Sequence, residues 1–85
     1  MPEEPEFDSH PSLRAYLRRL EESIAQVRHR LEAFERAYGQ DIETVFSRIR
    51  TGEMEMTEEL EEWAGEREML RRLVEQKEEL EARLR

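Results

Sequence analysis

The sequence predicts an all-α protein: an antiparallel helical hairpin, similar to a coiled coil, with a short connecting helix at its head. Three observations support this prediction. Apolar residues repeat at helical spacing in both halves of the chain, the pattern stops at Gly39 and Gly52, and 42% of the residues are charged. Long helices that each bury one narrow stripe need few apolar residues and tolerate many charges. Two long helices of nearly equal length would then fold back on each other.

The first long helix is expected over about residues 10–38. Its apolar residues are spaced alternately by four and three from Leu13 onward, and this seven-residue repeat is typical of a coiled-coil or bundle helix. Gly39 follows the last periodic residue, where the left-handed conformation that ends many helices is easiest for glycine. The residues of this helix that we expect in the core are Leu17, Leu20, Ile24, Val27, Leu31, Phe34 and Tyr38.

A short helix is expected over about residues 41–50, and a third helix over about 57–84. Asp41 and Thr57 are good N-caps for these two helices. One face of the short helix is apolar and would cover the aromatic residues that meet at the head. This face consists of Ile42, Val45, Phe46 and Ile49, and the aromatic residues are Phe34, Tyr38 and Trp63.

The third helix has a less regular apolar stripe than the first. Glu66 and Lys77 interrupt it, while Met69 widens it. Its expected core residues are Leu70, Leu73 and Leu80. Because the middle of this stripe is wider than one partner helix needs, we expect a homodimer in which two hairpins form a four-helix bundle.

The chain is long enough for one small domain only. Residues 1–9 are predicted to be a disordered acidic tail, and residues 10–85 a single helical-hairpin domain. Chains of this size seldom stabilise themselves with one core, so self-association agrees with the length as well.

The formal net charge is −8, and most of the excess lies in the tail and in residues 53–68, which contain eight glutamates and one arginine. A nucleic-acid-binding surface needs the opposite sign, so we expect no direct contact with nucleic acid. No apolar run approaches the length of a membrane span. The acidic N-terminus also lacks the apolar core of a secretory signal. These features predict a soluble, cytoplasmic protein without membrane contact.

Residues for catalysis or metal binding are not arranged in any known pattern. The chain has no cysteine, which excludes disulfides and thiolate zinc sites. His29 and Glu32 lie one turn apart, but such a pair is expected by chance in a chain with this many glutamates. No glycine-rich phosphate loop or serine nucleophile motif is present. We therefore expect a non-enzyme with no metal site and no cofactor, and a solvated His29.

The acidic run before and within the third helix has two interpretations. The first is a helix start matched to the helix dipole, which also improves solubility. The second is a docking surface for a small basic partner, with flexible methionines as apolar contacts. The candidate partner-binding residues are Phe46, Met54, Met56, Glu58, Glu59, Glu61, Glu62 and Trp63.

The middle of the chain has a pattern of aromatic residues and glycines in a charged helical background. A helix ends at Tyr38-Gly39, a short helix is centred on Phe46, Gly52-Glu53 follows, and an acidic stretch ends at Glu62-Trp63. Over about residues 31–75 this pattern resembles small acidic helical proteins that are the antitoxin halves of prokaryotic toxin–antitoxin pairs. The resemblance implies that the chain neutralises a small partner, with Phe46, Trp63 and the neighbouring glutamates as contacts. No DNA-binding module accompanies it.

The sequence thus predicts a protein–protein interaction module, an antitoxin-like subunit that neutralises a small basic partner through its acidic head. The alternative is a structural coiled-coil scaffold that assembles with itself. The two hypotheses differ in what covers the apolar and acidic surfaces of the third helix.

Overall fold

The structure is a computed structural model that describes residues 10–84 of the 85-residue chain. All regular elements in this range are helices: α1 (His10–Tyr38), α2 (Ile42–Arg50) and α3 (Glu58–Leu84). The all-α class predicted from the sequence is confirmed. The acidic tail predicted for residues 1–9 lies outside the described residues. None of the three described helices is both long and apolar enough to cross a membrane.

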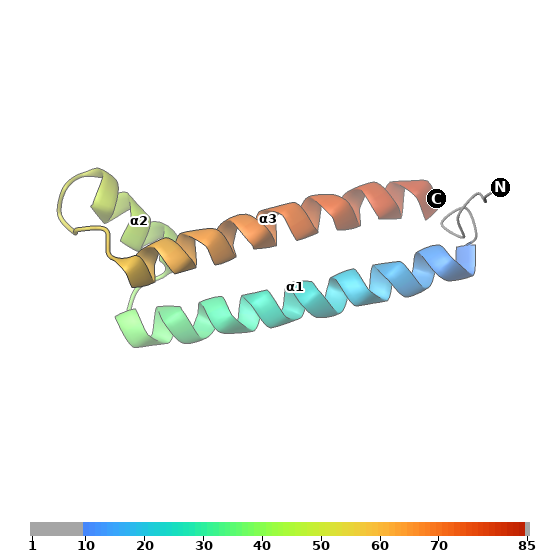
Figure 1. Cartoon of the computed structure of the whole chain (residues 1–85), viewed down its shortest axis with the longest axis horizontal. Helices are drawn as coiled ribbons and strands as arrows, with labels where there is room; N and C mark the ends of the chain where they lie inside the picture. The colour runs from blue at the N-terminus through green and yellow to red at the C-terminus, as the bar shows by residue number, and fades with distance from the viewer. Residues whose placement is uncertain (1–9, 85) are drawn as a thin grey trace.

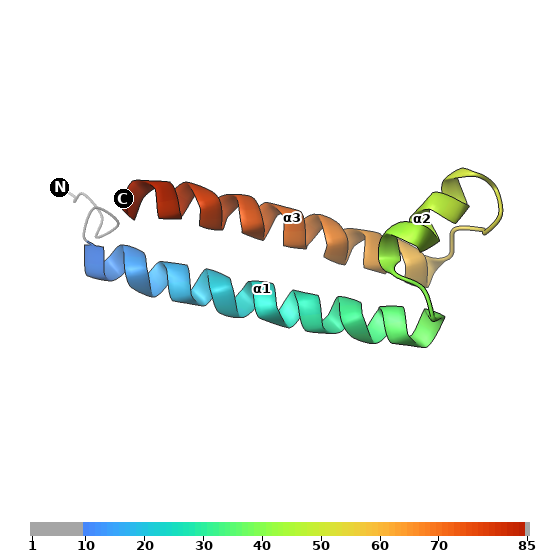
Figure 2. The same cartoon turned by 180° about the vertical axis from the view of Figure 1, so that it is seen from behind.

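α1 and α3 lie side by side and run in opposite directions, so that the protein is a rod of 55 × 22 × 21 Å (Figure 1). α2 lies on one face of this pair, close to the end of α1 and the start of α3 (Figure 2). We call this end of the rod, from Val27 to Glu66, the head. The other end, where α1 begins and α3 finishes, is the stem.

The helix ends are fixed by short-range hydrogen bonds. Gly39 has a φ of 71°, and its N–H donates to the Glu35 carbonyl at 2.8 Å, which ends α1. The Asp41 carboxylate accepts from the Thr44 N–H at 2.8 Å, and the Thr57 hydroxyl accepts from the Leu60 N–H at 3.2 Å. The two N-caps predicted from the sequence, at the starts of α2 and α3, are confirmed by these bonds.

The head contains the larger hydrophobic cluster. All three helices contribute to it, and the Phe34 ring lies between two other aromatic rings. Its centroid is 4.4 Å from that of Tyr38 and 4.6 Å from that of Trp63. The buried members of the cluster are Val27, Leu31, Phe34, Ile42, Val45, Phe46 and Leu60.

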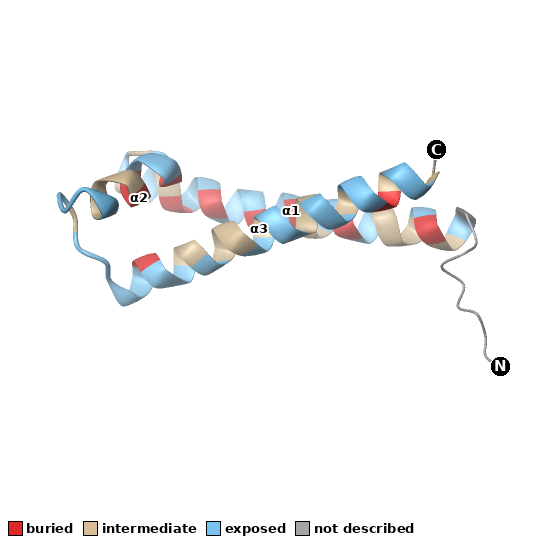
Figure 3. Ribbon diagram, turned by 90° about the horizontal axis from the view of Figure 1, so that it is seen from above, coloured by how far each residue is buried: buried red, intermediate tan, exposed pale blue. Residues whose placement is uncertain are grey.

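The stem contains a smaller cluster, because only two helices meet there. Its buried members are Leu13, Leu20 and Leu80. α3 has no buried residue between Leu60 and Leu80, and Figure 3 shows this middle segment as a mixture of half-buried and exposed residues. Among the residues that the sequence places in the core, four are only half-buried: Leu17, Tyr38, Leu70 and Leu73. A single neighbouring helix covers only part of such a side chain.

The two charged residues that interrupt the α3 stripe both pair with α1. Glu66 accepts from the Arg30 guanidinium at 2.9 Å, and the Lys77 ammonium lies 3.7 Å from the Glu21 carboxylate. Each charge would otherwise lie unpaired beside apolar side chains, which is unfavourable. The two ion pairs therefore allow charged residues in the contact between α1 and α3. They also fix the register of the two helices, with Glu66 opposite Arg30 and Lys77 opposite Glu21.

Candidate partner-binding surface

Four exposed glutamates lie within the first five residues of α3, on the head. Glu58, Glu59, Glu61 and Glu62 are all exposed, and we call them the acidic head surface. Their position is favourable because the unpaired N–H groups of the first helical turns attract negative charge. Among the described residues, no lysine or arginine pairs with any of the four. The glutamates that do form ion pairs are Glu21, Glu43, Glu53, Glu66, Glu68, Glu75 and Glu81.

One member of the acidic head surface is anchored to α1. The Tyr38 hydroxyl donates a hydrogen bond to the Glu59 carboxylate at 3.1 Å. Desolvation raises the pKa of Tyr38, and the hydrogen bond and negative charge of Glu59 raise it further. Tyr38 therefore stays protonated as a donor at neutral pH and holds the first turn of α3 against the end of α1.

The loop before α3 places one methionine beside this acidic surface. Met56 is 43% exposed, whereas Met54 is half-buried and packs against the head cluster. Trp63 is half-buried, and its ring lies against that of Phe34. Of the apolar residues predicted to contact a partner, Met56 offers the most surface, and Met54 and Trp63 offer only a part of theirs.

Phe46 is buried within the head, which departs from the expectation that it contacts a partner. Its side chain is 6% exposed because the apolar face of α2 turns inward over the end of α1 and the start of α3. The Arg67 guanidinium carbon lies 4.9 Å from the centroid of its ring, a distance typical of a cation–π contact. In this structure Phe46 stabilises the head and offers no surface to a partner.

Two residues that the sequence analysis did not single out hold α2 in place. The Arg67 guanidinium pairs with Glu43 at 2.9 Å and also covers Phe46. The Glu35 carboxylate accepts from the N–H of Ile42, the first residue of α2, at 2.9 Å. Arg67 follows Leu60 by seven residues, so the heptad spacing could have placed both on the same flank of α3.

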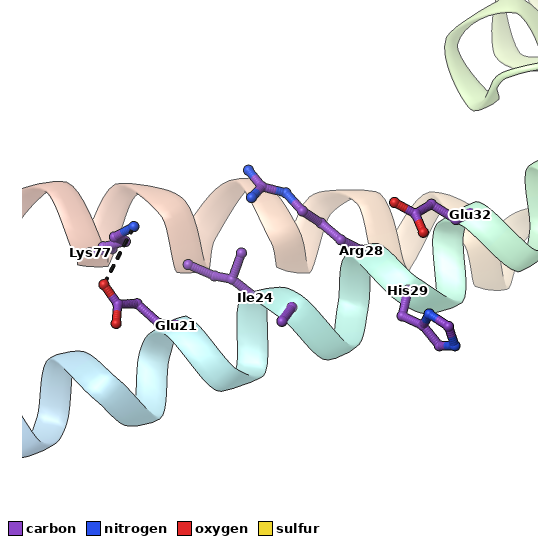
Figure 4. A pocket seen from close by; sticks show the side chains of 7 residues that line it. Glu21, Ile24, Arg28, His29, Glu32 and Lys77 are labelled. Atoms are coloured by element: carbon purple, nitrogen blue, oxygen red, sulfur yellow. Dashed lines mark ion pairs between the residues drawn. The ribbon is translucent and has the colours of Figure 1, made fainter.

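The region that the structure describes contains no cluster of side chains placed to hold a metal ion. No group of three or more His, Asp or Glu residues in residues 10–84 is placed to hold a metal ion. His29 and Glu32 line a shallow depression of about 340 Å³ on the face that carries α2 (Figure 4). The His29 ring points away from α3, whereas Arg28 and Glu32 point toward it. The two residues therefore do not converge on a common ligand position.

The chain matches no protein-family model, and neither the curated proteins nor the solved structures contain a match to it. The assignment of a function therefore depends on the surfaces of the molecule itself. The acidic head surface and the half-buried stripe of α3 are the two features that a partner could use.

Proposed function

We propose that this chain is a protein-binding module that docks a basic protein through its acidic head surface, and that it acts in the cytoplasm. The observation that supports this proposal is the density of unpaired glutamates at the start of α3. Glu58, Glu59, Glu61 and Glu62 lie within five residues, are all exposed, and pair with no described lysine or arginine. A partner that supplies cations at this surface would satisfy them.

The surroundings of the acidic head surface suit such a partner. A cluster of like charges accelerates and orients the approach of an oppositely charged protein. Met56 lies beside the cluster and can adapt its flexible side chain to an irregular apolar contact. The cluster sits on the most completely packed part of the molecule, so its geometry is set before binding, which reduces the entropy lost on association.

The narrower form of the proposal is an antitoxin-like role, in which the basic partner is a small toxin that the chain neutralises. This form rests on the resemblance of residues 31–75. It requires that the partner lose its own activity when bound, whereas the broader proposal requires binding alone.

The test uses the tagged chain as bait in its native host at moderate salt, followed by purification of any protein that co-elutes in stoichiometric amount. The proposal predicts a basic protein whose affinity falls as salt is raised. Replacement of Glu59→Lys together with Glu61→Lys should weaken binding at least about tenfold, because it exchanges attraction for like-charge repulsion.

The matched control replaces two exposed glutamates far from the head, Glu22→Lys together with Glu78→Lys. Neither residue forms an ion pair with another described residue, and the change in net charge is the same. The control should retain the affinity of the unaltered chain. Equal weakening by both double variants would indicate a response to net charge alone and would refute a docking surface at the head.

A second candidate function is self-assembly, in which two hairpins form a homodimeric four-helix bundle that serves as a scaffold. The observation that favours it is the half-buried stripe of α3, where Leu70, Leu73 and Val74 are incompletely covered by α1. A homodimer and a binding module are compatible where the dimer leaves part of the acidic head surface exposed to a partner.

A further inference from the structure

The α1–α3 pair has two broad faces, and α2 covers the head end of only one of them. Figures 1 and 2 show α2 on the far side of the pair in one view and on the near side in the other. We call the opposite face, which no described element covers, the open face. Because α2 stands out from its own face, only the open face allows a second rod to lie along the whole length of the first.

The residues of α3 on the open face follow from the position of Arg67, which points to α2. Successive helical residues are about 100° apart, so residues two positions before and after Arg67 lie roughly on the opposite side of α3. These are Gly65 and Met69. On α1, Glu21 and Arg28 line the depression on the α2 face. By the same spacing, Arg19, Ser23 and Arg30 of α1 lie toward the open face.

The centre of the open face has little unpaired charge and one large exposed apolar side chain. Met69 is 46% exposed. Gly65 has no atom within 4 Å of the position that a Cβ would take, so it leaves room for close approach. Arg30 is paired with Glu66 at 2.9 Å, and Arg72 with Glu68 at 3.4 Å. Contact with another protein would therefore cover few uncompensated charges here.

The two ends of the open face differ in charge. Glu58 and Glu62 precede Gly65 by seven and three residues, so they lie on the same side of α3 at the head. At the stem end, a depression of about 190 Å³ contains Glu79 and Arg83 beside Tyr16. Arg19 lies over the Tyr16 ring at 5.6 Å. Arg19 and Arg83 form no ion pair with another described residue, so among the described side chains of this end two unpaired cations lie near Glu79.

We infer that the open face binds a second copy of this chain in the antiparallel direction, so that each head lies on the stem of the other copy. The two-fold axis then crosses the middle of α3, near residue 71, with α3 against α3 and α1 against α1. Glu58 and Glu62 of each copy face the Arg83 end of the other. Tyr16 faces the small residues Ala33 and Ala37, which follow Arg30 by three and seven residues.

The opposite orientation, with head on head, leaves Glu58 and Glu62 without these cations. Charge complementarity therefore selects the antiparallel dimer. A face of the rod measures about 55 by 22 Å, which exceeds the roughly 800 Å² per partner of a standard specific interface. The inference deepens the self-assembly candidate and needs no basic partner; it shares Glu58 and Glu62 with the acidic head surface and leaves Glu59 and Glu61 outside the proposed contact with Arg83.

Sedimentation of the full chain tests the interface with a matched pair of variants. Met69→Glu places two like charges near the two-fold axis, and Met56→Glu makes the same change at a methionine of similar exposure in the loop, 43% against 46%. The unaltered chain and Met56→Glu should sediment as dimers, and Met69→Glu should raise the dissociation constant at least about a hundredfold. A monomeric unaltered chain, or equal effects of the two variants, would overturn the inference.

The orientation is tested with a spin label at the tip of the head. The chain has no cysteine, so Arg50→Cys gives a single labelled site at the end of α2, away from the open face. An antiparallel dimer separates the two labels by at least about the 55 Å length of the rod, because the thickness of the two rods adds to the separation along them. A head-on-head dimer would place them within the thickness of two stacked rods, each 21 Å thick, and that shorter distance would overturn the inference.

A charge exchange tests the same contact by a change in affinity. Glu58→Lys and Arg83→Glu should each weaken the dimer about tenfold or more, and the two changes in one chain should restore most of the loss. If the combined variant fails to restore association, Glu58 and Arg83 do not contact each other across the dimer, and the argument for the antiparallel orientation is refuted.

Discussion

The head and the stem contain the same two long helices, yet the helices are buried to different degrees. In the head, α2 adds a third apolar face, and Val45 and Leu60 are 0% and 1% exposed. In the stem no third helix is present among the described residues, and α3 contributes one buried residue, Leu80, beside half-buried Leu73 and Leu84. Contact between two helices buries one stripe of side chains on each helix, and a third helix is needed to bury the side chains beside that stripe.

The polar contacts of the head attach a third helix, whereas those of the stem lie between the two long helices. Arg67 and Glu35 use their charges to hold α2 on the head, next to buried apolar residues. In the stem, Lys77 lies within the seam itself and pairs with Glu21. The head is therefore complete within one chain, whereas the stem has surface to offer to another copy.

The largest expected effect is the loss of a buried side chain from the head. Leu60→Ala should lower the free energy of unfolding by about 3 kcal/mol, because it removes buried methyl groups and leaves a cavity among three helices. Leu73→Ala in the half-buried stem should cost less than half as much. Urea unfolding at one fixed protein concentration, followed by circular dichroism, measures both. Equal losses would contradict the difference in packing between head and stem.

Removal of the charge from the stem seam should strengthen the weaker region. Lys77→Leu is expected to raise the free energy of unfolding by about 1 kcal/mol, because it adds apolar contact next to Leu73 and Leu80. The two partly exposed ion pairs that it removes, with Glu21 and Glu81, contribute little. Lys77→Gln serves as the control, since it removes the charge without adding apolar surface. A stabilisation as large with glutamine as with leucine would show that packing is not the cause.

Two glycines should respond in opposite directions to the same substitution. Gly39 has a φ of 71° at the turn into α2, so Gly39→Ala should destabilise the protein by about 1 kcal/mol. Gly65 lies inside α3 with open space at its Cβ position, so Gly65→Ala should stabilise it by up to about 1 kcal/mol. Thermal unfolding of the two variants compares them. The comparison is made at a protein concentration at which the chain is monomeric, because the dimer would bring a second copy close to Gly65; destabilisation of the monomer by Gly65→Ala would contradict the expected gain in helix propensity.

The smallest expected effect concerns the acid sensitivity of α2. A hydrogen bond from the Thr44 N–H lowers the pKa of Asp41 in the folded protein. The cap therefore contributes stability above the unfolded pKa of about 3.9, and this contribution is lost as the pH falls through the lower folded pKa. Asp41→Asn keeps a capping side chain that does not titrate. The difference in melting temperature between the two proteins should shrink or change sign as the pH drops below about 4; a constant difference would exclude Asp41 as a contributor.

Helical periodicity and capping residues were sufficient to predict the three helices and their limits. The N-caps Asp41 and Thr57 and the turn at Gly39 are local features, so they can be recognised without tertiary structure. The buried α1 residues from Leu20 to Phe34 follow from the seven-residue repeat for the same reason. These predictions depend on spacing along a single helix, which the sequence contains in full.

Other features depend on how one helix packs against another, and they cannot be predicted from the residue spacing within a single helix. Periodicity placed Phe46 on the apolar face of α2, but it could not show whether that face turns toward the head or toward a partner. Arg67 was unremarkable in sequence, because its role requires α2 to lie over that flank of α3. Glu66 and Lys77 were recognised as interruptions, but their partners on α1 required the register of the two helices.

The most direct test of the difference between head and stem is amide hydrogen exchange at several protein concentrations. We expect head amides, from Val27 to Tyr38 and across α2, to be equally protected at all concentrations. Stem amides in residues 12–22 and 74–83 should lose protection on dilution, because the second copy that covers them dissociates. Protection that is uniform along the rod and independent of concentration would contradict both the incomplete stem and the dimer that completes it.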